Sequence, residues 1–398
     1  MATSNRNTRQ SNAVKNELEV VEDKEFEAVI KCFLFTGIIF TRSKDQSILK
    51  KFIIICLDVM VNCLFVYFMV TSVFRAAIKT NNSPGHAFIS GFKNFIGICL
   101  RLVILVKRPR ILKCSTRIAK LAKDVWLTNE CKSLRKYVWI GCGFSFLFPL
   151  FMNMGEMFIG GFNKNIRKYQ TMYLFLKDPI LESKPWLISL ILFLRVANIL
   201  MCNCFPLMVM VICTFVFTRI RDINLSFLEN LQKSLDMNLP AKLFSDYTIL
   251  YGKITNIIEK VEKTYSLISF FLYGYMLSSV FAITSKMVTT SSNSMNAASI
   301  IYQIASFFEI VVCFIFLSVR AASVNESAIE VKNVIHSLPA KRFDFSPNLT
   351  ATLLQLANNF ASEVCITGWG LFMINRGFIL TTAGVVVTYG VILVQLGG

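Results

Sequence analysis

Long apolar runs separated by shorter polar segments dominate this chain and predict its organisation. An apolar helix needs about 20 residues to cross a hydrocarbon core of about 30 Å. Runs of that length or longer occur at about 52–74, 86–106, 137–158, 186–217, 266–287, 298–319 and 377–398. We therefore predict an all-α membrane protein with seven transmembrane helices.

Two further stretches are helical in pattern but too polar to cross a membrane. In 218–265, apolar residues recur at helical spacing on both sides of Pro240, which predicts two amphipathic helices outside the membrane. Ser346 and Pro347 have the pattern of an N-cap and a first helical residue, and the helix that they begin is expected to end near Gly368.

The remaining connections are expected to be less regular. The apolar segment 32–40 is too short to span, so we expect it to pack against the helices or to lie at the membrane interface. The segment 161–185 is expected to be a loop, and 107–136 a basic segment between two spans.

Composition agrees with a membrane protein, and the distribution of charge predicts its orientation. The chain is 54% hydrophobic and 17% charged, whereas soluble domains carry about 25% charged residues. The net charge of +18 comes from basic clusters between the apolar runs, which are typical of topology signals and argue against nucleic-acid binding. The positive-inside rule places the N-terminus in the cytoplasm and the C-terminus outside, the reverse of a G-protein-coupled receptor.

Residue types that carry out catalysis or hold metals are sparse. His86 and His336 are the only histidines, and neither lies near a cluster of metal ligands. The sequence contains no nucleophile motif, phosphate-binding loop or dinucleotide fingerprint. All twelve cysteines lie in predicted spans or cytoplasmic segments, so no external disulfide framework is expected. We predict that the protein is not an enzyme and holds neither a metal nor an organic cofactor.

The last apolar run carries a polar stripe. After Arg376 it contains no charged residue, and its small and polar side chains recur at helical spacing on one face. This stripe consists of Thr381, Gly384, Thr388, Ile392 and Gln395.

The same run ends in a recognisable pattern. Thr388 and Tyr389, five apolar or small residues, and then Gln395 and Leu396 resemble the terminal TY-x5-QF signature of insect gustatory receptors. The chain departs from that signature at Leu396, where the family usually has phenylalanine.

The resemblance implies a fold similar to that of insect odorant receptors and a tetrameric, ligand-gated, non-selective cation channel. It implies that the last helix lines the pore at Thr381, Gly384 and Thr388, and that Ile392, Gln395 and Leu396 form the gate. It places the protein in the plasma membrane of chemosensory neurons, in contact with membrane lipids. The implied division of the chain is a cytoplasmic N-terminal segment (1–50), spans one to four (51–217), cytoplasmic anchor helices (218–265), spans five and six (266–320), a further anchor helix (321–370) and the pore-lining span (371–398).

Ionisable and polar residues within the spans are candidates for a ligand site, because charges in hydrocarbon are costly and must face protein or water. By the resemblance, a small-molecule tastant binds in the outer part of spans one to six. The candidates are Lys93, Glu156, Arg195, Tyr275, Ser278, Tyr302 and Gln303. Alternatively, Glu156 and Glu309 form structural ion pairs with the basic residues, and Arg101 is expected to be structural or to snorkel.

The sequence therefore predicts a gustatory receptor that forms a homo- or heterotetramer with other gustatory receptors. An odorant receptor of the same fold is the nearest alternative. A G-protein-coupled receptor would need the opposite orientation, and a secondary transporter often shows an internal repeat, which this sequence lacks.

Overall fold

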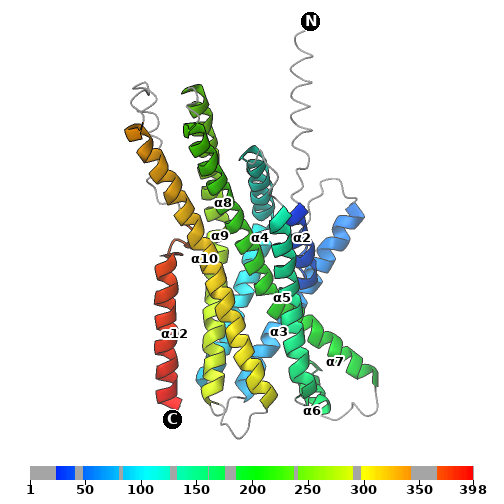
Figure 1. Cartoon of the computed structure of the whole chain (residues 1–398). Helices are drawn as coiled ribbons and strands as arrows, with labels where there is room; N and C mark the ends of the chain where they lie inside the picture. The colour runs from blue at the N-terminus through cyan, green and yellow to red at the C-terminus, as the bar shows by residue number, and fades with distance from the viewer. Residues whose placement is uncertain are drawn as a thin grey trace.

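The protein is built almost entirely from helices (Figure 1). The computed structural model describes residues 24–40, 48–79, 84–125, 132–159, 161–174, 185–236, 241–289, 297–341 and 365–397. The elements are α2 (Lys24–Phe33), η1 (Leu34–Thr36), α3 (Ile48–Lys79), α4 (Pro84–Val125), α5 (Lys132–Ile159), α6 (Phe162–Leu174), α7 (Pro185–Asn198), the π-helical segment η3 (Ile199–Cys204), α8 (Phe205–Asp236), α9 (Ala241–Thr289), α10 (Ala297–Lys341), β1 (Thr367–Gly368), β2 (Phe372–Met373) and α12 (Arg376–Gly397).

Within the described residues, six helical stretches are long and apolar enough to cross a membrane. They are Phe52–Ser72, Phe88–Val125, Lys136–Ile159, Trp186–Ser234, Asp246–Val288 and Ser299–Ile335. The apolar part of the last helix is shorter, at Arg376–Ile392. The all-α membrane fold is thus confirmed with six candidate spans, and the seventh span remains a prediction.

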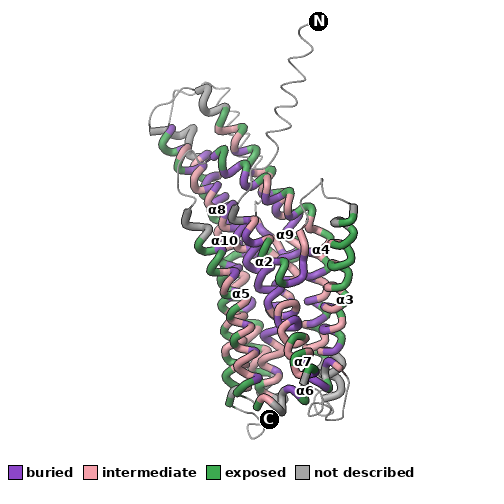
Figure 2. Tube along the Cα trace, turned by 90° about the vertical axis from the view of Figure 1, so that its right-hand side faces the viewer, coloured by how far each residue is buried: buried purple, intermediate pink, exposed green. Residues whose placement is uncertain are grey.

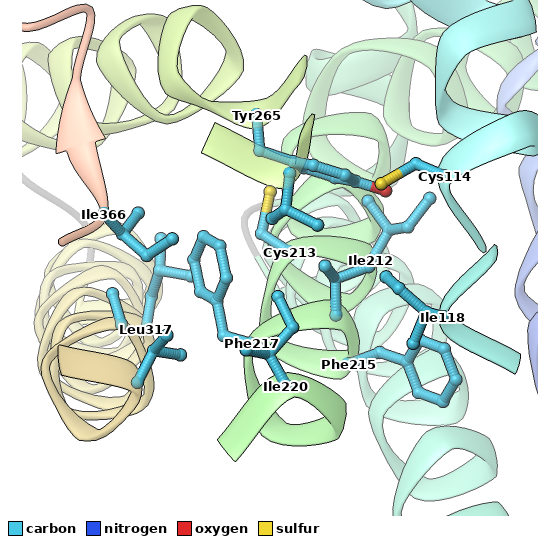
Figure 3. Close-up of a cluster of buried hydrophobic side chains, with 14 of the residues drawn as sticks. Cys114, Ile118, Ile212, Cys213, Phe215, Phe217, Ile220, Tyr265, Leu317 and Ile366 are labelled. Carbon is cyan, nitrogen blue, oxygen red and sulfur yellow. The ribbon is translucent and has the colours of Figure 1, made fainter. Parts of the chain in front are cut away.

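Helix α8 forms the centre of the core. All of its side chains from Phe205 to Cys213 are buried, because it is apolar on every face and packs against α4, α9 and α10. In Figure 3, Cys213 and Phe217 of α8 lie between side chains of α4 and those of α9 and α10. Figure 2 shows buried positions along the inner faces of the bundle and exposed positions along outer helices such as α3.

Helices α8, α9 and α10 extend well beyond one end of the bundle (Figure 1). The described parts of 218–265 belong to the ends of α8 and α9, and the basic residues of 107–123 lie on the continuation of α4. The helix expected after Ser346 lies outside the described residues until its predicted end near Gly368. The expectation of a loop over 161–185 is wrong in part, because α6 occupies Phe162–Leu174.

Two arginines of α4 hold the N-terminal segment against the bundle. Arg101 is only 1% exposed and donates hydrogen bonds to Asn62 Oδ1 at 2.8 Å and to the carbonyls of Thr36 at 3.0 Å and Gly37 at 3.2 Å. Two helical turns further on, the half-buried Arg108 donates to the Ile39 carbonyl at 2.8 Å and pairs with Asp58 of α3 at 2.8 Å. Of the two expectations for 32–40, the structure shows packing against the bundle at Phe33 and Ile38, while Leu34 and Phe35 are exposed. Arg101 is structural rather than snorkelling.

Candidate functional site

A cavity of about 450 Å³ lies inside the bundle and is rich in polar side chains. Its walls come from α4, α5, α6, α7, η3, α9 and α10, with smaller contributions from α3 and α8. The polar lining includes Ser90, Lys93, Asn94, Asn153, Glu156, Tyr169, Arg195, Asn198, Asn203, Tyr275, Lys286, Tyr302, Gln303, Ser306 and Glu309.

Arg195 is held in this cavity by two neighbouring elements. Its Nη2 donates to Asn153 Oδ1 of α5 at 2.7 Å, and its guanidinium carbon lies 4.6 Å from the centre of the Tyr169 ring on α6. Helix α6 is itself fixed, because Tyr173 is buried and its carbonyl accepts a hydrogen bond from the hydroxyl of Tyr67. The guanidinium therefore has a fixed position on the cavity wall.

The cavity wall also carries a second cation and a carboxylate. Lys93 of α4 lies over the Tyr275 ring of α9, with 5.4 Å between its Nζ and the ring centre. Among the described residues, Glu309 of α10 forms no ion pair with Lys93, Arg101 or Arg195, so its expected structural pairing is not observed. Glu309 Oε1 and Asn94 Nδ2 also have no hydrogen-bond partner within the described part of the chain. These buried polar atoms are available to a ligand or to water.

Six predicted ligand-site residues line this one cavity, although they come from five helices. They are Lys93, Glu156, Arg195, Tyr275, Tyr302 and Gln303. Ser278 does not line it, because its hydroxyl is buried against its own helix and donates to the Tyr275 carbonyl at 3.0 Å.

The sequence reasoning missed several residues of the lining. Asn153 lies three positions before Glu156, and so on the same helical face, which is a signal that could have found it. Tyr169 lies in the segment 161–185, for which the sequence predicts a loop. Ile166, Tyr169 and Tyr173 nevertheless recur at helical spacing, and all three are buried.

Among the described residues, the last helix, α12, packs mainly against α9 and α10. Thr382 is buried, and the Tyr389 ring lies 4.2 Å from the Phe281 ring of α9. The stripe residues Thr381, Gly384, Thr388, Ile392 and Gln395 are all exposed in the single chain. The backbone of Leu396 is helical, and its side chain lies outside the described residues.

A short hairpin, formed by β1 and β2, precedes α12 and fastens it to α9. Glu262 of α9 accepts hydrogen bonds from the Thr367 hydroxyl and from the Thr367 backbone N–H, the latter at 3.0 Å. The Trp369 backbone N–H donates to the Ser266 carbonyl at 3.2 Å. Trp369 and Gly370 both have positive φ, at 53° and 72°, as the central residues of a type I′ turn require.

Aromatic rings pack the start of α12 against both α9 and α10. Phe378 stacks on Phe372 at 4.8 Å and lies edge-on to Tyr273 of α9 at 5.3 Å, and Phe314 of α10 completes the group at 5.9 Å. We call these four residues the base cluster. The hydroxyl of Tyr273 also lies 3.0 Å from Ser318 Oγ on α10.

The cavity and the base cluster share the same two helices. On α9, Tyr275 lines the cavity and Tyr273, two residues earlier, belongs to the base cluster. On α10, Cys313 lines the cavity and the adjacent Phe314 belongs to the base cluster. The walls of the cavity and the contacts that hold α12 are therefore built on the same two helices.

Comparisons with known proteins agree with this architecture. A family model described as Trehalose receptor matches residues 158–398. The insect olfactory receptor OR5 from Machilis hrabei, solved in complex with eugenol, is similar over 94% of this chain and 98% of its own, with a TM-score of 0.59 at 15% identity. A further structure of OR5 has a TM-score of 0.54 at 14% identity over the same shares of both chains. No curated protein sequence matches the chain. The protein belongs to the trehalose receptor family of insect gustatory receptors, and it is a multi-pass protein of the plasma membrane.

Proposed function

We propose that this chain is a subunit of a ligand-gated cation channel that opens when a small tastant binds the cavity. The observation that carries this proposal is the sharing of α9 and α10 between the cavity and the base cluster of α12. The exposed polar stripe of α12 supplies a surface that water and cations tolerate. A ligand with higher affinity for the open state than for the closed state would then favour opening.

The cavity lining favours a sugar-like ligand. Hydroxyl groups need hydrogen-bond donors and acceptors, which Asn153, Asn203, Arg195 and Glu309 provide around a space of typical size for small-molecule sites. Tyr275 and Tyr302 add aromatic rings to this lining. This agrees with the description of the matched family as trehalose receptors. The same polar lining favours a gustatory receptor over an odorant receptor, although OR5 binds eugenol within a similar fold.

Four copies of the chain would place α12 around a central axis, with the N-terminus in the cytoplasm and the C-terminus outside. This topology makes α12 the seventh span, and it makes 218–265 and 321–370 the cytoplasmic anchor.

Gln395 and Leu396 would lie at the narrowest part of the pore, with Ile392 one turn below. A ring of apolar side chains closes such a pore by excluding water, and withdrawal of the ring admits cations. The tetramer forms from identical chains or together with other gustatory receptors.

Calcium entry into cells that express the receptor tests ligand gating. We expect one of a panel of mono- and disaccharides to evoke entry, and Arg195→Gln to raise the half-maximal concentration roughly tenfold, as the loss of one charge-assisted hydrogen bond does. Ser278→Ala is the matched control, because Ser278 lies beside the cavity without lining it. Equal responses of both variants and the wild type would exclude this cavity as the ligand site.

A matched pair of substitutions on α12 tests the pore. Thr388 lies on the stripe, whereas Val387 is exposed and lies about 100° around the helix from it. We expect Thr388→Asp to assemble and to change cation conductance, because its carboxylate would face water. We expect Val387→Asp to reduce assembly, because its carboxylate would face hydrocarbon or a neighbouring helix. The opposite pattern would show that the stripe faces lipid.

A further inference from the structure

A second and larger cavity, of about 600 Å³, opens between α5, α8 and α10. It lies at the depth where three predicted spans leave the hydrocarbon. Tyr137, at the start of span three, lines it, as do Arg219, just after span four, and Arg320, just after span six. The cavity is therefore at the membrane interface and is separate from the ligand cavity.

The lining of this cavity carries both basic and acidic side chains. Arg219, Arg221 and Arg320 line it together with Asp222 and Glu229, so the arginines outnumber the acids by one. Arg219 is only 5% exposed, and its guanidinium carbon lies 5.7 Å from the centre of the Phe215 ring. A guanidinium that is buried in this way and lines a cavity is suited to an anionic group.

Apolar surface continues from the cavity toward the membrane centre. On α5, Ile140 is 67% exposed and Leu147 is 70% exposed. On α10, Phe316 lines the cavity, and Val312, one turn nearer the membrane centre, is 61% exposed. A ligand with its charged headgroup in the cavity would place its hydrocarbon tails against these side chains.

We propose that this cavity binds the headgroup of an anionic glycerophospholipid. Arg219, Arg221 and Arg320 would hold its phosphate, and its acyl chains would lie along α5 and α10. The carboxylates of Asp222 and Glu229 suit a headgroup that also carries an ammonium group, so phosphatidylserine is the best match. The site rests on the topology proposed above, which puts it in the cytoplasmic leaflet, where anionic lipids are enriched.

Native mass spectrometry tests this site on the purified receptor taken from nanodiscs of phosphatidylcholine with a minority of phosphatidylserine. We expect the wild type to retain phosphatidylserine over phosphatidylcholine, and Arg219→Gln with Arg320→Gln to reduce that preference roughly tenfold or more. The matched control is Arg110→Gln with Lys113→Gln, because both side chains are exposed on α4 and neither lines the cavity. An unchanged preference in the first variant, or an equal loss in the control, would overturn the proposal.

Two further measurements distinguish the remaining explanations. Glycerophosphoserine has the same headgroup without acyl chains, so its displacement of the lipid at similar concentration would indicate a site for soluble phosphate instead. If the variant at buried Arg219 fails to assemble, Arg221→Gln with Arg320→Gln replaces it, because these side chains are half-buried. Neither readout uses sugar or ion flow, so failure of the proposed channel function would not be mistaken for failure of this site.

Discussion

The contact between Glu262 and the hairpin provides the sharpest test of how the cavity is coupled to α12. The Glu262 carboxylate accepts two hydrogen bonds from Thr367, one from its hydroxyl and one, at 3.0 Å, from its backbone N–H. Glu262→Gln keeps the shape but removes the charge and puts an amide NH₂ near one of these donors. Charge-assisted hydrogen bonds contribute about 1.5–3 kcal/mol and neutral ones about 0.5–1.5 kcal/mol. The charge assistance of the two bonds amounts to about 2–3 kcal/mol in full, but the contact is only part-buried and the Thr367 hydroxyl can rotate to accept from the new amide, so we expect a net loss of about 1.5 kcal/mol.

A loss of that size changes an equilibrium constant roughly tenfold. We expect Glu262→Gln to lower the maximal ligand-evoked current and to raise the half-maximal ligand concentration up to about tenfold. The reason is that a displacement of α9 on ligand binding would be transmitted less fully to α12. Voltage clamp measures both quantities, with surface labelling to correct for expression. Glu259→Gln is the control, since Glu259 lies almost one turn earlier on α9 and its ion pair within the described part of the chain is with the exposed Lys263, at 2.6 Å. Indistinguishable currents from the two variants would refute coupling through this contact.

Three other predictions concern single substitutions in the N-terminal packing, the hairpin and the last helix. Gly368→Ala should lower the thermal unfolding midpoint, because a Cβ there would lie 2.2 Å from the Phe372 ring. Gly143→Ala, inside α5, should leave the midpoint unchanged or raise it slightly, because beyond the neighbouring backbone of its own helix no atom lies within 4 Å of the added Cβ. Arg101→Gln should lower the same midpoint by more than an exposed arginine substitution does, because it leaves buried carbonyls without donors at a cost of about 1–3 kcal/mol each. Leu396→Ala should raise the resting current if Leu396 belongs to the gate, and an unchanged resting current would remove it from the gate.

Hydropathy and charge were sufficient to predict the membrane fold. The apolar runs are long, and a charge within them is so costly that Lys93 and Arg195 could be assigned to the protein interior from sequence. The hairpin before α12 could not be predicted, because its strands are two residues long and depend on Glu262 and Ser266 of a distant helix. Burial of α6 likewise depends on neighbouring helices, so a window with many polar residues resembled a loop.

The π-helical segment η3 explains why part of the cavity lining could not be found from helical periodicity. Asn198 and Asn203 both line the cavity, although they are five residues apart. In an unbroken α-helix, five residues advance the direction of a side chain by about 500°, which leaves the two asparagines about 140° apart. Hydrogen bonds of the π type, from i to i+5, bring such residues toward the same face, and η3 spans Ile199–Cys204, between these two positions. A single π-helical turn therefore adds a second amide to the wall that already carries Arg195. Because single π-helical turns are rare and occur frequently at functional sites, the position of η3 on the cavity wall supports a role for the cavity in binding a ligand.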